Sequence, residues 1–213
     1  LLSSCVLESD DAGLYIFSFE YDFSESNHDW VAGFSDYPAG PDDSAFFELK
    51  HAYTSCPTGS GNAIMLSGNN HSDDLFMYIK KKITGLKASS DYTLTFEVEL
   101  ASNAPPGVSG TNGAPGANVF LKVGAAGMEP KSVIDERWFE MNIDKGNQGE
   151  GGEDMITIGD IATLDASGDY SITNRSNLLS SNTNPLIGRT NSKGELWLIV
   201  GTDSGFEGVT TLY

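Results

Sequence analysis

The sequence has little positive charge. Only 12 of its 213 residues are Lys or Arg, against 30 Asp or Glu, so the net charge is -18 at pH 7. A negative field of this size repels nucleic acid and anionic lipid, and the composition therefore argues against partners of either kind. No apolar run approaches the roughly 20 residues of a membrane-spanning helix, so the sequence predicts no membrane span.

Catalytic motifs are also missing. The three histidines, His28, His51 and His71, do not show the spacing of a zinc site. The string "GTDSG" lacks the Gly-x-Ser-x-Gly pattern of a nucleophile elbow, and no glycine-rich phosphate loop is present. The sequence therefore predicts a protein without catalytic activity.

The chain contains two cysteines, Cys5 and Cys56. The string "LLSSC" resembles the end of a bacterial lipoprotein signal, in which small residues precede a lipid-bearing cysteine, here Cys5. That resemblance implies that residues 1–5 are a signal remnant or N-terminal extension and that 6–213 form one domain. The alternative is a Cys5–Cys56 disulfide in an exported domain. Both interpretations predict an extracellular or cell-surface location, with a lipid anchor in the first case.

What the sequence does contain is strand-like periodicity. In "DYTLTFEVEL" the apolar residues from Tyr92 to Leu100 alternate with Thr and Glu, as in an antiparallel strand with one buried face. The continuous apolar runs 75–79 and 196–200 are typical of central strands covered on both faces. Further strands are predicted at 14–23, 45–53, 62–67, 117–125, 136–143, 155–162, 169–175 and 207–213.

These strands define the expected fold class. Turn-forming clusters such as "YPAGPDDS", "PTGSGN" and "DKGNQGEGG" separate them, and no long helical pattern appears. About ten strands with little helix predict an all-β protein, an antiparallel two-sheet β-sandwich.

The two ends of the chain carry a family resemblance. The strings "FSFEYDFSESNHDW" and "GFEGVTTLY" resemble the terminal strands of galactose-binding-like and carbohydrate-binding-module jelly rolls. This resemblance implies a jelly roll whose first and last strands pair side by side, and a carbohydrate ligand. In these families the last strand commonly ends in an aromatic followed by acidic residues, whereas this chain stops at Tyr213.

Four aromatic residues are candidates for contacting such a ligand. Trp30, Phe34 and Tyr37 lie in the loop-like stretch "DWVAGFSDYP", and Trp138 lies near another turn. Sugar rings stack their C–H faces on aromatic rings, while neighbouring Asp, Asn and Gln bind hydroxyl groups. The alternative for Trp30 and Trp138 is that both anchor the core at the ends of the sandwich.

A structural calcium ion is the predicted cofactor. Calcium takes six to eight oxygen ligands, mostly from carboxylates and loop carbonyls. Three acidic segments would converge if the terminal strands were neighbours, and their carboxylates are Glu20, Asp22, Asp73, Asp74, Asp203 and Glu207. The alternative is that these side chains cap backbone N–H groups in turns.

The function predicted from these observations is an exported, cell-surface, non-catalytic binding domain. Its partner would be an extracellular glycan or a surface protein. Two alternatives stand beside it: a structural subunit of a fibre or surface layer that self-assembles through edge strands, and a glycan-processing enzyme.

Overall fold

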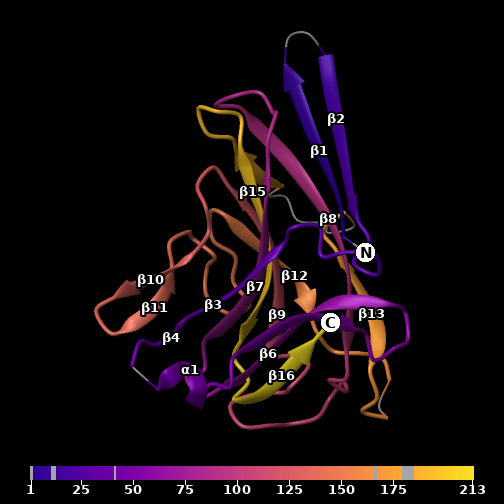
Figure 1. Cartoon of the computed structure of the whole chain (residues 1–213), viewed down its shortest axis with the longest axis vertical. Helices are drawn as coiled ribbons and strands as arrows, with labels where there is room; N and C mark the ends of the chain where they lie inside the picture. Colours follow the sequence, from indigo (N-terminus) through magenta and orange to yellow (C-terminus); the bar gives the residue numbers. More distant parts are fainter. Residues whose placement is uncertain (1, 11–12, 41, 166, 179–184) are drawn as a thin grey trace.

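The computed structural model describes residues 2–10, 13–40, 42–165, 167–178 and 185–213, with side chains from residue 16 onward. Within this part the chain is built from antiparallel strands, and the short α1 (Asp43–Phe46) is the one α-helix (Figure 1). The fold is an all-β antiparallel β-sandwich, as predicted. In the described ranges no helix is both long and apolar enough to cross a membrane.

The first layer is a five-stranded sheet around the long strand β8. Its order is β13-β8-β1-β2, and β14 also pairs with β8. The strands are β1 (Leu2–Asp10), β2 (Gly13–Tyr21), β8 (Asp91–Ser102), β13 (Ser171–Ser176) and β14 (Leu186–Arg189). The predicted alternation of β8 is confirmed, because Tyr92, Leu94, Phe96, Val98 and Leu100 are all buried.

The second layer is a sheet in the order β12-β9-β15-β7-β3. Its strands are β3 (Val31–Ser35), β7 (Leu75–Ile83), β9 (Val119–Ala126), β12 (Met155–Asp160) and β15 (Leu196–Ser204). Two smaller sheets complete the fold, in the orders β16-β6-β5 and β10-β11-β4. They consist of β4 (Tyr37–Pro38), β5 (Lys50–Ser55), β6 (Asn62–Asn70), β10 (Ser132–Asp135), β11 (Trp138–Met141) and β16 (Gly208–Leu212).

The second layer is covered on both faces. Toward the first layer, Met77 of β7 and Leu198 of β15 join the main core with the inward residues of β8. On the opposite face, Phe76 and Ile199 belong to a smaller core with Met155. The runs 75–79 and 196–200 are therefore central strands, as predicted, because successive side chains point to opposite faces.

Two sequence predictions on strands need correction. The strand predicted at 45–53 begins only at Lys50, because residues 43–46 form α1. The terminal strands also do not pair with each other: β2 pairs with β1, and β16 pairs with β6. Strand β1 lies between β2 and β8 and takes the place expected for the last strand. The backbone of Tyr213 instead exchanges two hydrogen bonds with Ala101 of β8.

A cleft above a buried charge cluster

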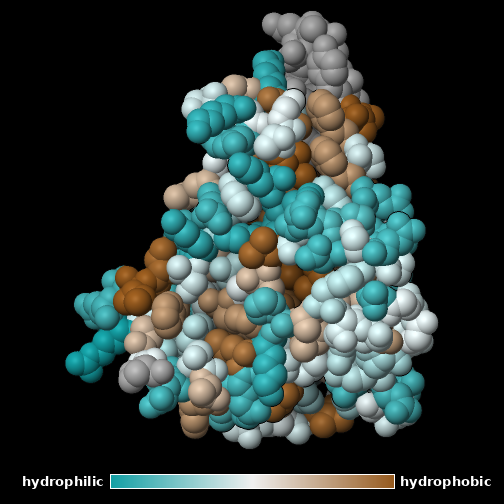
Figure 2. Space-filling model, in the orientation of Figure 1, coloured by the Kyte–Doolittle hydropathy of each residue, from teal (hydrophilic) through white to brown (hydrophobic). Residues whose placement is uncertain are grey.

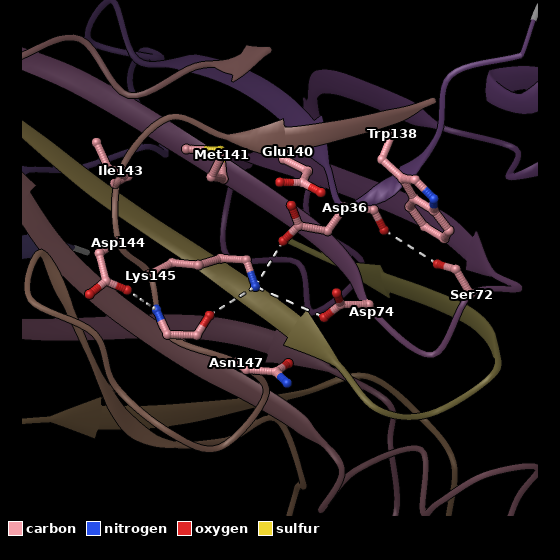
Figure 3. A pocket seen from close by; sticks show the side chains of 11 residues that line it. Asp36, Ser72, Asp74, Trp138, Glu140, Met141, Ile143, Asp144, Lys145 and Asn147 are labelled. Carbon is pink, nitrogen blue, oxygen red and sulfur yellow. Dashed lines mark hydrogen bonds and ion pairs between the residues drawn. The ribbon is translucent and has the colours of Figure 1, made fainter. Parts of the chain in front are cut away.

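A cleft of about 460 Å³ opens on the outer face of the second layer. Strand β11 and the loop 142–147 form one wall, and residues next to β3 and β7 form the other (Figure 3). Its lining residues are Asp36, Ser72, Asp74, Trp138, Glu140, Met141, Ile143, Asp144, Lys145, Gly146 and Asn147. We call this feature the Trp138 cleft, since Trp138 is its aromatic residue.

Strand β11 presents Trp138 and Glu140 together. They are two positions apart, so their side chains stand on one face of the strand. The intervening Phe139 turns the other way and packs on Tyr37, with ring centroids 4.9 Å apart. Trp138 is 39% exposed, and Glu140 makes no hydrogen bond or ion pair within the described residues. Both side chains are therefore available to a ligand.

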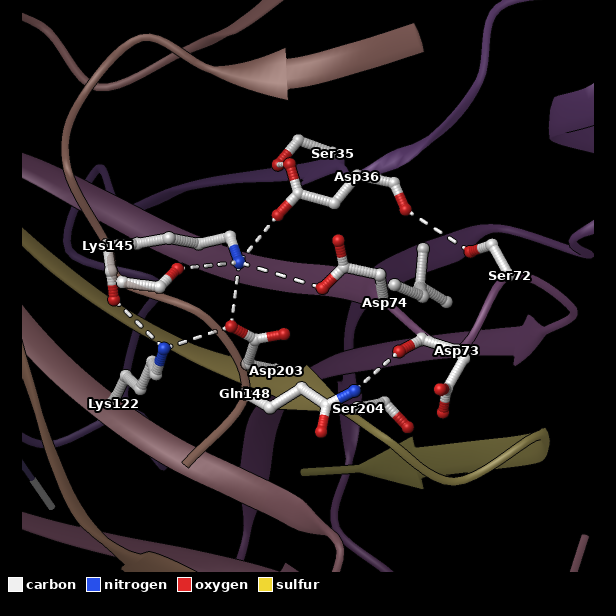
Figure 4. Close-up of polar contacts among 12 residues, drawn as sticks. Ser35, Asp36, Ser72, Asp73, Asp74, Lys122, Lys145, Gln148, Asp203 and Ser204 are labelled. Carbon is white, nitrogen blue, oxygen red and sulfur yellow. Dashed lines mark hydrogen bonds and ion pairs between the residues drawn. The ribbon is translucent and has the colours of Figure 1, made fainter. Parts of the chain in front are cut away.

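Beneath the cleft lie five charged side chains, which we call the buried charge cluster: Asp36, Asp74, Lys122, Lys145 and Asp203 (Figure 4). Oδ2 of Asp203 accepts hydrogen bonds from Nζ of Lys122 at 3.0 Å and from Nζ of Lys145 at 2.7 Å. Nζ of Lys145 also lies 2.8 Å from Oδ2 of Asp36 and 4.0 Å from Oδ1 of Asp74. Lys145 is thus the centre of the cluster.

The register of the second layer assembles these residues. Asp203 of β15 lies opposite Phe76 of β7, and Phe76 in turn lies opposite Ser35, the residue before Asp36. Lys122 of β9 is paired with Gly201, where the absence of a side chain leaves room for the ring of Phe76. A single row across three strands therefore brings Asp36 near Asp203, and Lys122 lies two positions along β9 from the residue opposite Asp203.

Burial determines the ionisation of the cluster. Both side chains of the Lys122–Asp203 pair are 0% exposed. Burial lowers the pKa of Lys122, against the opposing effect of Asp203. Burial also acts against the charge of Lys145, but Asp203 and Asp36 outweigh it and raise the pKa of Lys145 above its ordinary value. Lys145 is therefore firmly cationic.

The two carboxyl groups nearest the cleft retain protons more strongly than usual. Burial raises the pKa of Asp36, although Lys145 opposes the shift. Burial, together with Asp203 and Asp36, raises the pKa of Asp74 to about 7, again against Lys145. The side chain of Asp74 is 43% exposed, yet its Oδ1 is enclosed and accepts no hydrogen bond within the described residues. Oδ1 of Asp203 is likewise enclosed and accepts no hydrogen bond within the described residues.

Of the four aromatic residues predicted to bind a ligand, Trp138 lies in the cleft. Trp30 is 4% exposed and packs edge-on against Tyr21, so it is a core anchor. Tyr37 is buried between Phe47 and Phe139, and Phe34 packs against the main core. The low exposure of Trp30 and Tyr37 favours a place for both in the core, and a ligand contact at either stays a prediction.

The six predicted calcium ligands do not come together. Asp203 and Asp74 meet at Lys145, while Asp73 offers its carbonyl oxygen to Nε2 of Gln148. The other three lie in separate parts of the fold. Asp22 caps the backbone of Ser24, and Glu207 donates its backbone N–H to the carbonyl oxygen of Thr111. Glu20 is exposed on β2. In the part of the chain that the structure describes, no group of three or more His, Cys, Asp or Glu is arranged to hold a metal. At Asp203, two ammonium groups supply the positive charge expected from calcium.

The structure describes the side chain of only one of the two cysteines, Cys56. Cys56 is a buried free thiol whose sulfur lies 3.2 Å from Oγ1 of Thr58, so the predicted disulfide with Cys5 is not formed in this structure. The side chain of Cys5 lies outside the described residues, and its backbone belongs to β1. Lipid attachment at Cys5 stays a prediction.

Sequence reasoning did not identify Asp36, Lys122, Lys145 or Glu140 as site residues. A signal for one of them was present. Lys122 interrupts the apolar string "ANVFLKVGA", which was correctly predicted as a strand. A lysine among buried residues needs a buried anionic partner, and Asp203 is that partner.

Comparison with known proteins gives little further information. No protein-family model and no curated protein matches the chain. A solved structure from a study of promiscuous specificity in carbohydrate-binding modules of the β-sandwich superfamily aligns with a TM-score of 0.39 and 10% identity, covering 99% of this chain and 70% of the other. A likeness of this degree identifies neither a ligand nor an activity.

Proposed function

We propose that this protein is a non-catalytic carbohydrate-binding domain whose ligand occupies the Trp138 cleft. The observation that carries the proposal is the half-exposed ring of Trp138 beside a polar floor containing Ser72, Asp74 and Asn147. A sugar ring stacks its C–H face on an aromatic side chain and directs its hydroxyl groups to carboxylates, amides and hydroxyls. The cleft supplies both kinds of surface side by side.

The cleft volume agrees with this ligand class. Small-molecule sites measure about 300–1,000 Å³, and this one measures about 460 Å³. Export of the domain is part of the proposal and rests on the string "LLSSC" and the acidic composition.

The test is glycan-array binding followed by calorimetry on the glycans retained. Replacing a buried aromatic anchor of an interface commonly costs 2 kcal/mol or more, so Trp138→Ala should weaken binding by about 30-fold, whereas Trp138→Phe should retain part of the affinity. Phe46→Ala is the matched control, because Phe46 is an exposed aromatic outside the cleft. Equal affinity in wild type and Trp138→Ala would disprove the proposed site.

A second candidate function is glycan hydrolysis, and Asp74 is the observation that favours it. A carboxyl group with a pKa of about 7, in a cleft that also contains Asp36 and Glu140, has the protonation expected of a general acid. The same incubations distinguish the two functions by chromatography of the oligosaccharide. Shortened products that disappear in Asp74→Asn would establish an enzyme, and unchanged oligosaccharide would support binding alone.

A further inference from the structure

We propose that the Trp138 cleft selects glycans carrying a free ammonium group, that is, amino sugars that are not N-acetylated. This inference rests on the proposed function and specifies its ligand class. It follows from the charge distribution in the cleft, from the unpaired Glu140 beside Trp138, and from the unsatisfied carboxylate oxygens of the floor.

The cleft has an excess of negative charge. Four carboxyl groups line it, those of Asp36, Asp74, Glu140 and Asp144, against the single ammonium group of Lys145. Lys145 is only 8% exposed at its side chain, and its Nζ is directed at Asp203 and Asp36 (Figure 4). The one cation of the lining therefore serves the protein's own carboxylates and offers little charge to a ligand.

The cluster below has more acids than bases, and burial lets Asp74, with a pKa of about 7, keep its proton at lower pH. Its three aspartates face two lysines, and both lysines are bound to the same oxygen of Asp203, Oδ2. Oδ1 of Asp203 and Oδ1 of Asp74 remain enclosed without a hydrogen bond from the described residues. An enclosed carboxylate oxygen without a donor is unfavourable. A ligand ammonium group near Asp74 would supply a donor to this floor and, as a neighbouring cation, would favour the ionised form of Asp74.

Trp138 and Glu140 form the matching rim. A cation over an indole face is attracted by the ring, and the neighbouring carboxylate of Glu140 is free to pair with it. Asp144 stays ionised, since hydrogen bonds from the backbone N–H groups of Glu153 and Gly146 lower its pKa. Anionic sugars would be repelled by this rim. An N-acetylated sugar would provide an amide in place of the charge.

The surface around the rim has the same character. Figure 2 shows a largely hydrophilic surface with apolar residues gathered at the β10–β11 hairpin. There the exposed Val133 is paired with Glu140 and so stands on the same face of the hairpin as Trp138. The side chain of Val133 offers contact area to a further sugar ring, while the acids of the cleft select the charge.

The experiment compares three tetrasaccharides of equal length by calorimetry at about pH 6: glucosamine with free amines, N-acetylglucosamine, and glucose. We expect the free amine to bind at least about tenfold more tightly than the other two, a difference of about 1.4 kcal/mol. Glu140→Gln should reduce its affinity about two- to fivefold, in keeping with an exposed ion pair, and leave the neutral tetrasaccharides unchanged. Glu136→Gln is the matched control, an exposed glutamate of the same hairpin outside the cleft lining.

Two outcomes distinguish a failure of selection by charge from a failure of carbohydrate binding itself. If a neutral tetrasaccharide binds through Trp138 as tightly as the free amine does, selection by charge is overturned and carbohydrate binding stands. If none of the three binds and the glycan array is also empty, the proposed function is overturned, and the ligand class with it.

Discussion

Asp203 holds two lysines with one oxygen in a fully enclosed position. Removing its charge leaves Lys122 buried without a counter-ion, and breaking a buried pair in this way costs about 3–5 kcal/mol. We therefore expect Asp203→Asn to lower the free energy of unfolding by about that amount in urea titration. Asp135→Asn, on an exposed position of β10, should change it by less than about 0.5 kcal/mol.

A double-mutant cycle tests whether the pair itself is responsible. Lys122→Met combined with Asp203→Asn removes both charges, so the double variant should be clearly more stable than the sum of the single losses predicts. Additivity within about 0.5 kcal/mol would show that the two residues are not coupled.

Asp74 makes the stability of the fold depend on pH. Its pKa is about 7 in the folded protein against 3.8 ordinarily, because of burial and the facing Asp203 and Asp36, partly offset by Lys145 and Lys122. Between these two values the folded state keeps a proton that the unfolded chain has released. The stabilisation by Asp74 is complete below about pH 4 and is lost as pH rises through 7.

We therefore expect Asp74→Asn to abolish this loss. The difference in melting temperature, variant minus wild type, should grow from pH 5 to pH 7 and stay constant above it. A difference that is the same at every pH would mean that Asp74 titrates as it does in the unfolded chain.

At the scale of elements, the sequence predicted a strand correctly wherever that strand was long enough to show a periodic pattern of apolar residues. The alternation of β8 and the apolar runs of β7 and β15 suffice, because each covers five or more residues and burial follows the pleat. Strand β4 has two residues and β10 has four, too few for a pattern to appear. Strand β11, which forms part of the cleft wall, lies within the strand predicted at 136–143, whereas its partners β4 and β10 were not predicted.

The candidate site was predictable only in part, for a related reason. Trp30 and Trp138 both follow turn-forming residues, and nothing local distinguishes the buried ring from the exposed one. The charge cluster depends on Ser35, Phe76 and Asp203 lying in one row across β3, β7 and β15. These pairings join residues 127 and 41 positions apart, and the periodicity of each strand alone does not determine them.

At the scale of the whole molecule, the net charge of -18 sets the response to salt. The acidic side chains are mostly on the surface, so they repel one another more strongly in the compact state than in the expanded chain. Salt reduces this repulsion, since the screening length falls from about 30 Å at 0.01 M to about 10 Å at 0.1 M. The buried charge cluster is shielded from solvent and should respond little.

We expect the melting temperature to rise by about 2–4 °C between 10 and 150 mM NaCl, as a gain near 1 kcal/mol would produce in a domain of this size. Sucrose at equal osmolarity controls for effects unrelated to charge. The affinity for the glucosamine tetrasaccharide should change in the opposite direction over the same range, because salt also screens the attraction between the acidic cleft and a cationic ligand. A melting temperature that is unchanged or lower in NaCl would show that surface repulsion does not limit the stability of this fold, whatever its ligand.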